Sequence, residues 1–334
     1  MTQHPAKSKL KTQSLSSLAA RRSLRRKLLL WYDAHRRDLP WRASSDPYRI
    51  WISEIMLQQT RVAAATDYYL RFLQRFPTIK SLAAAPLDSV LSAWSGLGYY
   101  RRARMMHQAA QKIVGELDGE FPQTAEALLQ LPGIGRYTAA AIASIAFAQP
   151  VAVVDGNVDR VLSRLSGRAL ADGELWSLAN LLLDPDRPGD FNQAMMELGA
   201  TVCLPKEPAC LVCPIVSLCA TRGSLAAGPR QVRLKREICY ALGCRNGSIF
   251  MVQRSKDASL MAGMWELPEV SLNGKLLEAE FVLKHSITVT DFAVKVVRQR
   301  PPRAARGQWL KRERLQDYAL TGLARKILRR AEII

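Results

Sequence analysis

The sequence predicts a mainly α-helical protein that ends in a smaller α+β domain, and three observations support this fold class. Apolar residues recur at helical spacing through most of residues 24–222, where alternating strand patterns are scarce. Short runs rich in β-branched residues appear only in the last third of the chain. The length of 334 residues suits two domains at about 150 residues each.

The charge balance indicates a polyanionic partner. Lys and Arg number 48 against 29 Asp and Glu, which leaves a net charge of +19. Nucleic acid is the first candidate and an anionic membrane surface the second. No run of 18 apolar residues occurs, which excludes a membrane-spanning helix, and no apolar segment of signal-peptide type follows the basic N-terminus. We therefore expect a monomer that is cytoplasmic and nucleoid-associated and does not act at membranes.

Composition also sets the expected domain boundaries. Residues 1–27 hold eight basic residues and no acid, so residues 1–23 are predicted to form a basic flexible arm. The helical domain follows at 24–222. A stretch rich in Gly, Ser and Ala then predicts a linker at 223–236, and the second domain occupies 237–334.

Hydrophobic periodicity places the helices of the first domain. Ile50, Trp51, Ile55 and Val62 recur at helical spacing, and the helix over 87–94 is ended by glycines at 96 and 98. Further helices are predicted at 125–131, 137–147, 158–165, 175–183 and 191–198.

The second domain reads as strands followed by a helix. Strands are predicted at 238–242, 248–252 and 291–297. A closing helix carries Leu320, Leu323, Ile327 and Leu328 on one face and basic residues on the other. Residues 295–334 hold twelve basic and three acidic residues, which indicates a second positive surface.

The segment LPGIGRYTA at 131–139 joins two predicted helices through a glycine-punctuated turn. Gly133 and Gly135 permit positive φ and let backbone N–H groups approach an anion, while the next helix directs its positive end to the same place. A DNA phosphate would fit there. The alternative to a phosphate-binding turn is a tight interhelical turn without a ligand.

Two carboxylates stand out as candidate acid–base groups. Asp155 precedes a predicted helix, where an Asp is most often an N-cap. Glu54 is surrounded in sequence by apolar residues, and burial of its face would raise its pKa and suit it to general-acid work. The alternative is an ordinary glutamate on an exposed helical face.

Four of the six cysteines form a C-x6-C-x2-C-x5-C cluster at 203, 210, 213 and 219. Four thiolates at such spacing suit either tetrahedral zinc or an iron–sulfur cubane, and the spacing does not separate them. Clustered cysteines also indicate a reducing compartment. Cys239 and Cys244 stand apart and are expected to be structural.

Together these motifs resemble a known family. The run at 131–139, VDGNV at 154–158 and the cysteine spacing are similar to those of the helix-hairpin-helix DNA glycosylases of the endonuclease III superfamily. The stretches LPWR at 39–42, PYRIWISEIMLQQT at 47–60, WSGLGYYRRAR at 94–104 and FNQAMMELGA at 191–200 narrow the resemblance to adenine DNA glycosylases of MutY type. It is strong over 24–222 and weaker over 237–330.

The resemblance implies a helix-hairpin-helix glycosylase core with a 4Fe–4S cluster held by Cys203, Cys210, Cys213 and Cys219, and double-stranded DNA as the partner. It implies hydrolysis of the N-glycosidic bond of adenine paired with 8-oxoguanine or guanine. Glu54 would protonate the departing base as general acid. Asp155 would stabilise the oxocarbenium ion or capture it covalently, and Tyr137 and Asn157 would position Asp155 and the leaving base.

The resemblance also implies binding residues. Those expected to line the adenine pocket are Trp41, Arg42, Leu57, Val62 and Glu197. Those expected to contact DNA are Gln59, Tyr99, Gly133, Gly135 and Arg136. Bifunctional relatives carry a lysine where this chain has Tyr137, and a phenol cannot form an imine, so we expect a monofunctional enzyme.

The C-terminal region resembles the Nudix-like domain with which such enzymes recognise 8-oxoguanine. LMAGMWELP at 260–268 carries this resemblance, while the catalytic Nudix box is absent from the sequence. Thr288 is the expected lesion-reading residue, although the family's His is replaced here by an aliphatic residue. Two other hypotheses are a pyrimidine-directed glycosylase/lyase of endonuclease III type and a non-catalytic DNA-binding protein.

Overall fold

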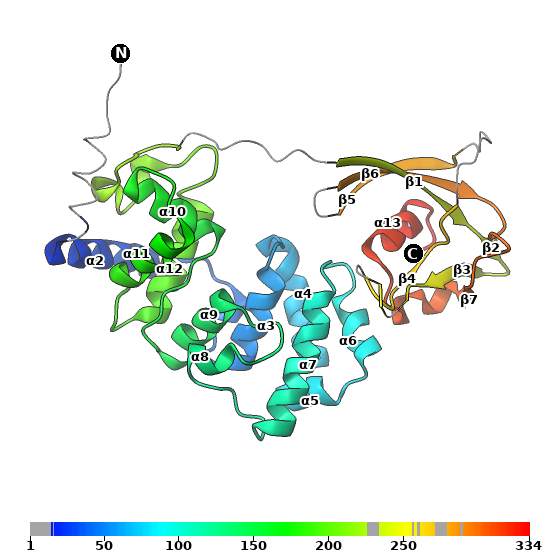
Figure 1. The fold of residues 1–334 in the computed structure, drawn as a ribbon, viewed down its shortest axis with the longest axis horizontal. Coiled ribbons are helices and arrows are strands. Elements are labelled where there is room, and N and C mark those ends of the chain that lie inside the picture. The colour runs from blue at the N-terminus through cyan, green and yellow to red at the C-terminus, as the bar shows by residue number, and fades with distance from the viewer. Residues whose placement is uncertain are drawn as a thin grey trace, which may run out of the picture. The chain divides into compact units, whose positions relative to one another are not determined.

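The computed structural model describes residues 15, 17–225, 234–255, 257–258, 261–270, 279–287 and 290–334 (Figure 1). The chain divides into two compact units. The first contains residues 1–70 and 112–228, and the second contains 71–111 and 229–334. Residues 71–111 thus group with the C-terminal part of the chain, whereas a linear boundary near residue 222 would assign them to the helical domain.

The first unit is helical, and its described residues contain no strand. Its helices are α2 (Leu18–His35), η1 (Pro40–Arg42), α3 (Pro47–Leu57), the first part of α4 (Val62–Arg75), the end of α7 (Arg101–Glu116), α8 (Ala125–Leu128), α9 (Arg136–Phe147), α10 (Gly156–Ser166), α11 (Asp172–Leu182) and α12 (Pro188–Thr201). Two short turns, η2 (Cys210–Val212) and η3 (Val216–Leu218), follow in the cysteine segment.

Local capping decides where two of these helices begin and end. The Ser17 hydroxyl accepts a hydrogen bond from the N–H of Ala20 at 3.2 Å, so α2 starts at Leu18, within the predicted flexible arm. Gln58 is extended and Gln59 has a φ of 56°, which ends α3. Val62 therefore begins a separate helix, and the prediction of one helix through residues 50–62 is wrong.

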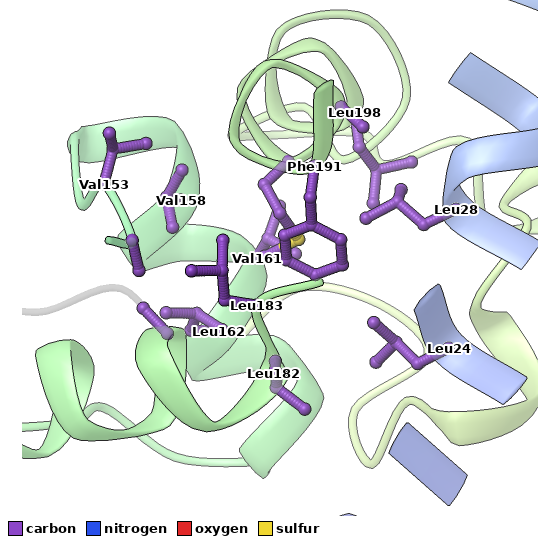
Figure 2. Close-up of a cluster of buried hydrophobic side chains, with 14 of the residues drawn as sticks. Leu24, Leu28, Val153, Val158, Val161, Leu162, Leu182, Leu183, Phe191 and Leu198 are labelled. Carbon is purple, nitrogen blue, oxygen red and sulfur yellow. The ribbon is translucent and has the colours of Figure 1, made fainter. Parts of the chain in front are cut away.

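The core of the first unit joins α2, α10, α11 and α12. Figure 2 shows Phe191 of α12 among buried side chains that include Leu28 of α2 and Val161 of α10. Each of these three side chains is almost fully buried. Truncating such a residue costs about 3–5 kcal/mol, so this cluster holds α10 and α12 firmly against each other.

The second unit combines helices with two small sheets. Its elements are the end of α4, α5 (Ile79–Ala84), α6 (Leu87–Trp94), the first part of α7 (Arg101–Glu116), β1 (Leu234–Leu242), β2 (Cys244–Arg245), β3 (Ser248–Gln253), β4 (Trp265–Glu266), β5 (Phe281–Ile287), β6 (Thr290–Arg298), β7 (Gln308–Lys311), η4 (Arg312–Asp317) and α13 (Gly322–Arg330). β6 lies between β1, to which it is parallel, and β5, to which it is antiparallel. β3 pairs with β2, β4 and β7.

The three predicted strands correspond to β1, β3 and β6, and the closing helix to α13. β5 and β7 were not predicted, because their burial is too slight to leave a clear apolar pattern. Cys239 is buried in β1, whereas Cys244 is exposed in β2 and does not pack in a core. No helix in the described ranges is both long and apolar enough to span a bilayer.

Candidate active site

A pocket of about 720 Å³ opens in the first unit where α3, α9, α10 and α12 meet. Most of the site residues expected from the sequence line it. They are Trp41, Arg42, Glu54, Leu57, Gln59, Val62, Gly133, Gly135, Arg136, Tyr137, Asp155, Asn157 and Glu197. The sequence reasoning did not identify Arg37, Thr60, Thr138, Gln193 and Met196 as site residues, although they also line the pocket.

Glu54 is a buried acid on α3. Only 6% of its surface is exposed, because α3 buries nearly all of its residues from Ile50 to Met56. The pKa of the Glu54 carboxyl is raised to about 7, mainly by burial. A hydrogen bond from Tyr137 opposes this rise, and the nearby Asp155 charge adds to it. A carboxyl with such a pKa holds a proton in a large share of molecules near neutral pH. The exposed-face alternative for Glu54 is therefore wrong.

Tyr137 on α9 contacts this acid directly. Its hydroxyl donates to Oε2 of Glu54 at 2.6 Å and also lies 3.2 Å from the sulfur of Met196. Burial raises the pKa of the Tyr137 phenol well above its ordinary value, and the carboxylates nearby raise it further. The phenol is thus a neutral donor. Its recorded partners are Glu54 and Met196 rather than Asp155.

Asp155 occupies the N-cap of α10 and also lines the pocket. Its Oδ1 accepts hydrogen bonds from the backbone N–H groups of Asn157, at 2.9 Å, and Val158, at 2.8 Å. Its Oδ2 accepts from the side-chain amide of Asn157 at 3.0 Å. The cap interpretation and the functional one are therefore compatible, because the donors that cap the helix also stabilise negative charge on the carboxylate.

Glu197 on α12 is the second buried glutamate of the pocket. Arg37 donates to it from its backbone N–H, its Nε and its Nη2, and Arg42 donates at 2.8 Å. Burial alone would raise the pKa of Glu197, but these hydrogen bonds outweigh it and lower the pKa to about 2. Arg37 could have been anticipated from the sequence, because a buried glutamate needs cationic partners.

The predicted hairpin turn lies between α8 and α9. Gly133 has a φ of 75°, as the turn chemistry predicted, whereas Gly135 has a φ of −92° and is the extended N-cap of α9. Of the two glycines that permit positive φ, the turn therefore uses this freedom at Gly133. No side-chain hydrogen bond caps the N-terminus of α9, and Gly135, Arg136 and Tyr137 at this end line the pocket. The Arg136 guanidinium stacks on Trp176, with its carbon 3.8 Å from the ring centroid.

The two residues whose side chains are expected to enter the duplex share an uncommon backbone conformation. Gln59, in the first unit, and Tyr99, in the second, are non-glycine residues with left-handed φ values of 56° and 48°. Such backbone costs about 1–3 kcal/mol and concentrates at functional positions. Tyr99 is 47% exposed, which leaves it available to a ligand.

The four clustered cysteines all lie in the described segment at 203–219. Burial raises the pKa of Cys213 to about 11, with further contributions from the other three thiols. The four cysteines are all partly exposed, and an N–H of Arg164 donates to the sulfur of Cys203 at 3.2 Å, a type of contact found around sulfur-ligated clusters. As placed, no three His, Cys, Asp or Glu side chains among the described residues form a metal-holding group.

Two features expected from the resemblance fall wholly or partly outside the described residues. Thr288 lies outside the described residues, between β5 and β6. The start of LMAGMWELP at 260 also lies outside them, while β4 begins at Trp265 within that motif.

Comparison with known proteins places this pocket in a family. The model of the HhH-GPD superfamily base excision DNA repair protein matches residues 52–172. The mouse adenine DNA glycosylase is 42% identical over 77% of this chain and 62% of its own length, and the human adenine DNA glycosylase is 49% identical over 68% of this chain and 42% of its own length. The chain thus spans less than two thirds of these relatives.

A solved structure adds the fold. A thermostable thymine-DNA glycosylase is 31% identical, with a TM-score of 0.57, over 60% of this chain and 96% of its own. The matched segment carries Glu54, the hairpin turn and Asp155. This chain therefore belongs to the HhH-GPD superfamily of base-excision DNA repair proteins, and over much of its length it is similar to adenine DNA glycosylases.

Proposed function

We propose that this protein is a monofunctional adenine DNA glycosylase that hydrolyses the N-glycosidic bond of adenine opposite 8-oxoguanine or guanine in duplex DNA. One observation carries the proposal. The pocket pairs Glu54, whose pKa is about 7, with Asp155, whose carboxylate accepts three N–H hydrogen bonds. One group is suited to deliver a proton and the other to carry negative charge.

The extruded adenine receives its proton from Glu54. Adenine leaves as a poor anion unless a ring nitrogen is protonated, and N7 is accessible once the base has left the stack. Tyr137 donates to Oε2 of Glu54 and thereby keeps the carboxyl in place while its proton is transferred. No amine stands at position 137, so the chain lacks the group that relatives use for Schiff-base chemistry.

Asp155 acts on the sugar. As the glycosidic bond breaks, positive charge develops on the deoxyribose, and a carboxylate fixed at a helix N-terminus stabilises it or captures it covalently. Water then completes the hydrolysis. The amide of Asn157 prevents rotation of the Asp155 carboxylate, so that Oδ2 keeps its direction during the reaction.

The Glu197 end of the pocket recognises the base. Glu197 is held ionised by Arg37 and Arg42, so it can accept a hydrogen bond from the exocyclic amine of adenine. Trp41, Leu57 and Val62 supply apolar surface for the ring. A pyrimidine lacks both the size and the donor pattern of adenine.

Other contacts hold the duplex. The uncapped N-terminus of α9, with Gly133, Gly135 and Arg136 before and at its start, binds a phosphate. Gln59 and Tyr99 enter the duplex near the mispair. The C-terminal unit, with Thr288 in its lesion-reading loop, distinguishes 8-oxoguanine from guanine.

The four cysteines are proposed to hold a 4Fe–4S cluster that stabilises the segment 203–219 and supplies no step of the reaction. Iron and acid-labile sulfide should each be present at about four per chain, the stoichiometry of such a cluster. Cys213→Ser should lower both, whereas Cys244→Ser is the matched control. Zinc in place of iron and sulfide would contradict the assignment.

Alkali treatment tests the proposed function. A labelled duplex with adenine opposite 8-oxoguanine is incubated under single-turnover conditions and split into treated and untreated halves. Strand breaks that need alkali indicate base loss without a lyase step. Equal breaks in both halves would indicate a lyase, and binding without breaks would indicate a non-catalytic protein. Replacing 8-oxoguanine by guanine, in wild type and in Thr288→Ala, measures the lesion preference.

A further inference from the structure

The loop that presents Tyr99 is bonded to the C-terminal segment within the second unit. The Tyr100 hydroxyl donates to the backbone carbonyl of Leu320 at 3.0 Å, and the Ser95 hydroxyl donates to the same oxygen at 3.2 Å. The Arg325 guanidinium of α13 donates to the Ser95 hydroxyl at 2.6 Å. Ser95, Tyr100 and Leu320 are all buried. More than 200 residues separate the two segments in the chain.

Further contacts connect Tyr100 to the loop that presents Tyr99. The N–H of Gly96 donates to the Tyr100 hydroxyl at 3.2 Å, so one side chain contacts both the loop and Leu320. The indole N–H of Trp94 donates to the carbonyl of Gly98 at 3.0 Å. Arg102 stacks on the rings of both Trp94 and Tyr99, at 5.4 and 5.3 Å from their centroids.

Leu320 and its neighbour Thr321 are in turn bonded to the C-terminal sheet through β4. Leu320 forms a parallel bridge with Trp265 of β4, and the N–H of Thr321 donates to the Trp265 carbonyl at 2.9 Å. β4 is in turn paired with β3. A second bond, from Arg104 to the carbonyl of Ala262, joins the start of α7 to the segment before β4.

We propose that the Leu320 carbonyl and the Arg325 guanidinium position the loop that presents Tyr99, so that the C-terminal sheet sets the orientation of the residue that enters the duplex. The inference rests on the proposed function only for the role of Tyr99. The left-handed backbone of Tyr99 needs such support, because strained backbone persists only where its surroundings determine it. Ser95, Tyr100 and Arg325 are positioning residues in this sense, since none of them needs to touch DNA.

Base unstacking provides a readout that does not require excision. The full-length protein is mixed with a duplex that carries 2-aminopurine next to the adenine of the 8-oxoguanine pair, and fluorescence reports how far the stack opens. Tyr100→Phe and Arg325→Met remove the two kinds of bond. The matched controls are Tyr318→Phe, and Arg329→Met on the same helix with the same loss of charge.

Both test variants should bind the duplex as their controls do, since each matched pair carries the same charge. Each should reduce the rate of fluorescence increase by about 5-fold, the effect of one lost buried hydrogen bond. Hydrogen exchange at residues 96–101 should accelerate in both. Excision of an adenine placed opposite an abasic site, which is already unpaired, should change less than excision of a paired adenine.

The inference would be overturned if the test variants open the base stack and undergo hydrogen exchange at the same rates as their controls. Equal losses on paired and unpaired adenine would also overturn it, because they would indicate general damage to the fold. A wild-type protein that opens the stack without releasing adenine would instead refute the proposed function, and the effects of the variants on unstacking and exchange would still support the positioning role.

Discussion

Two buried glutamates line the pocket, and the pKa values of their carboxyl groups differ widely. Glu54 is 6% exposed and Glu197 is 1% exposed, yet the pKa of Glu54 is about 7 and that of Glu197 is about 2. Burial raises the pKa at both sites. The difference lies in the partners, since Glu54 receives a hydrogen bond from a neutral phenol and Glu197 receives several from two guanidinium groups.

The comparison shows that one pocket can hold two buried glutamates with very different pKa values, because their hydrogen-bond partners differ. Cations at the Glu197 end stabilise its charge at a site from which water is largely excluded. At Glu54, the hydrogen bond from the Tyr137 phenol and the nearby Arg42 charge offset only part of the burial effect, so the pKa of this carboxyl is about 7.

Replacing the acid should have the largest effect. Glu54→Gln keeps the shape of the side chain but removes the transferable proton, so the single-turnover rate of adenine release should fall about 1000-fold, within the range for a positioned general acid. Binding to the uncleaved duplex should stay close to that of the wild type. Glu126→Gln, at an exposed position on α8, is the matched control. Full activity in Glu54→Gln would exclude the assigned role.

The two glutamates should also differ in how they couple stability to pH. A raised folded pKa gives Glu54 a stabilising contribution that is present below about pH 4.5 and is lost as pH rises through about 7. Urea unfolding should therefore show Glu54→Gln gaining up to about 3 kcal/mol on the wild type between about pH 5 and about pH 8.

Glu197 predicts the opposite sign in a different pH window. Its depressed pKa gives a contribution that is present above about pH 4.5 and is lost as pH falls toward about 2. The stability difference between Glu197→Gln and the wild type should thus stay flat where that of Glu54→Gln changes. Parallel curves for the two variants would remove the contrast between the two ends.

Removing a cation from the Glu197 end should lower stability. Arg42→Met leaves the buried carboxylate with one guanidinium partner and should reduce the free energy of unfolding by about 2 kcal/mol, the value of a charged hydrogen bond. The Arg37 side chain is 37% exposed against 12% for Arg42, so Arg37→Met should cost less. A larger loss in Arg37→Met would show that exposure does not rank the two bonds.

The smallest expected effect tests the Glu54 end. The hydrogen bond from Tyr137 lowers the pKa of Glu54, so Tyr137→Phe should raise it. Because the acid works in its protonated form, excision falls as pH rises through this pKa, and the falling limb should move up by about half a unit to one unit in the variant. The limb in the wild type, measured under single-turnover conditions, is the control, and a downward shift would contradict the hydrogen-bond role.

The contacts at Leu320 show that distant neighbours matter in the second unit as well. Residues 71–111 were predicted to belong to the first domain because their helical pattern continues that of their neighbours. The structure groups them with the C-terminal region, where Ser95 and Tyr100 share a backbone acceptor. Periodicity reports the type of an element but carries no information about which distant segment covers it.

The helical nature of the first 220 residues, the strands around β1, β3 and β6, and more than half of the residues that line the pocket could be predicted from the sequence. Those features depend on periodicity, glycine punctuation and motif spacing, which are local properties of the chain. The tertiary structure alone decided that Glu54 is buried against Tyr137, that Arg37 joins Arg42 on Glu197, and that Leu320 holds the Tyr99 loop. These are contacts between segments 80 or more residues apart, and a pKa or a loop position depends on the neighbours that folding brings together.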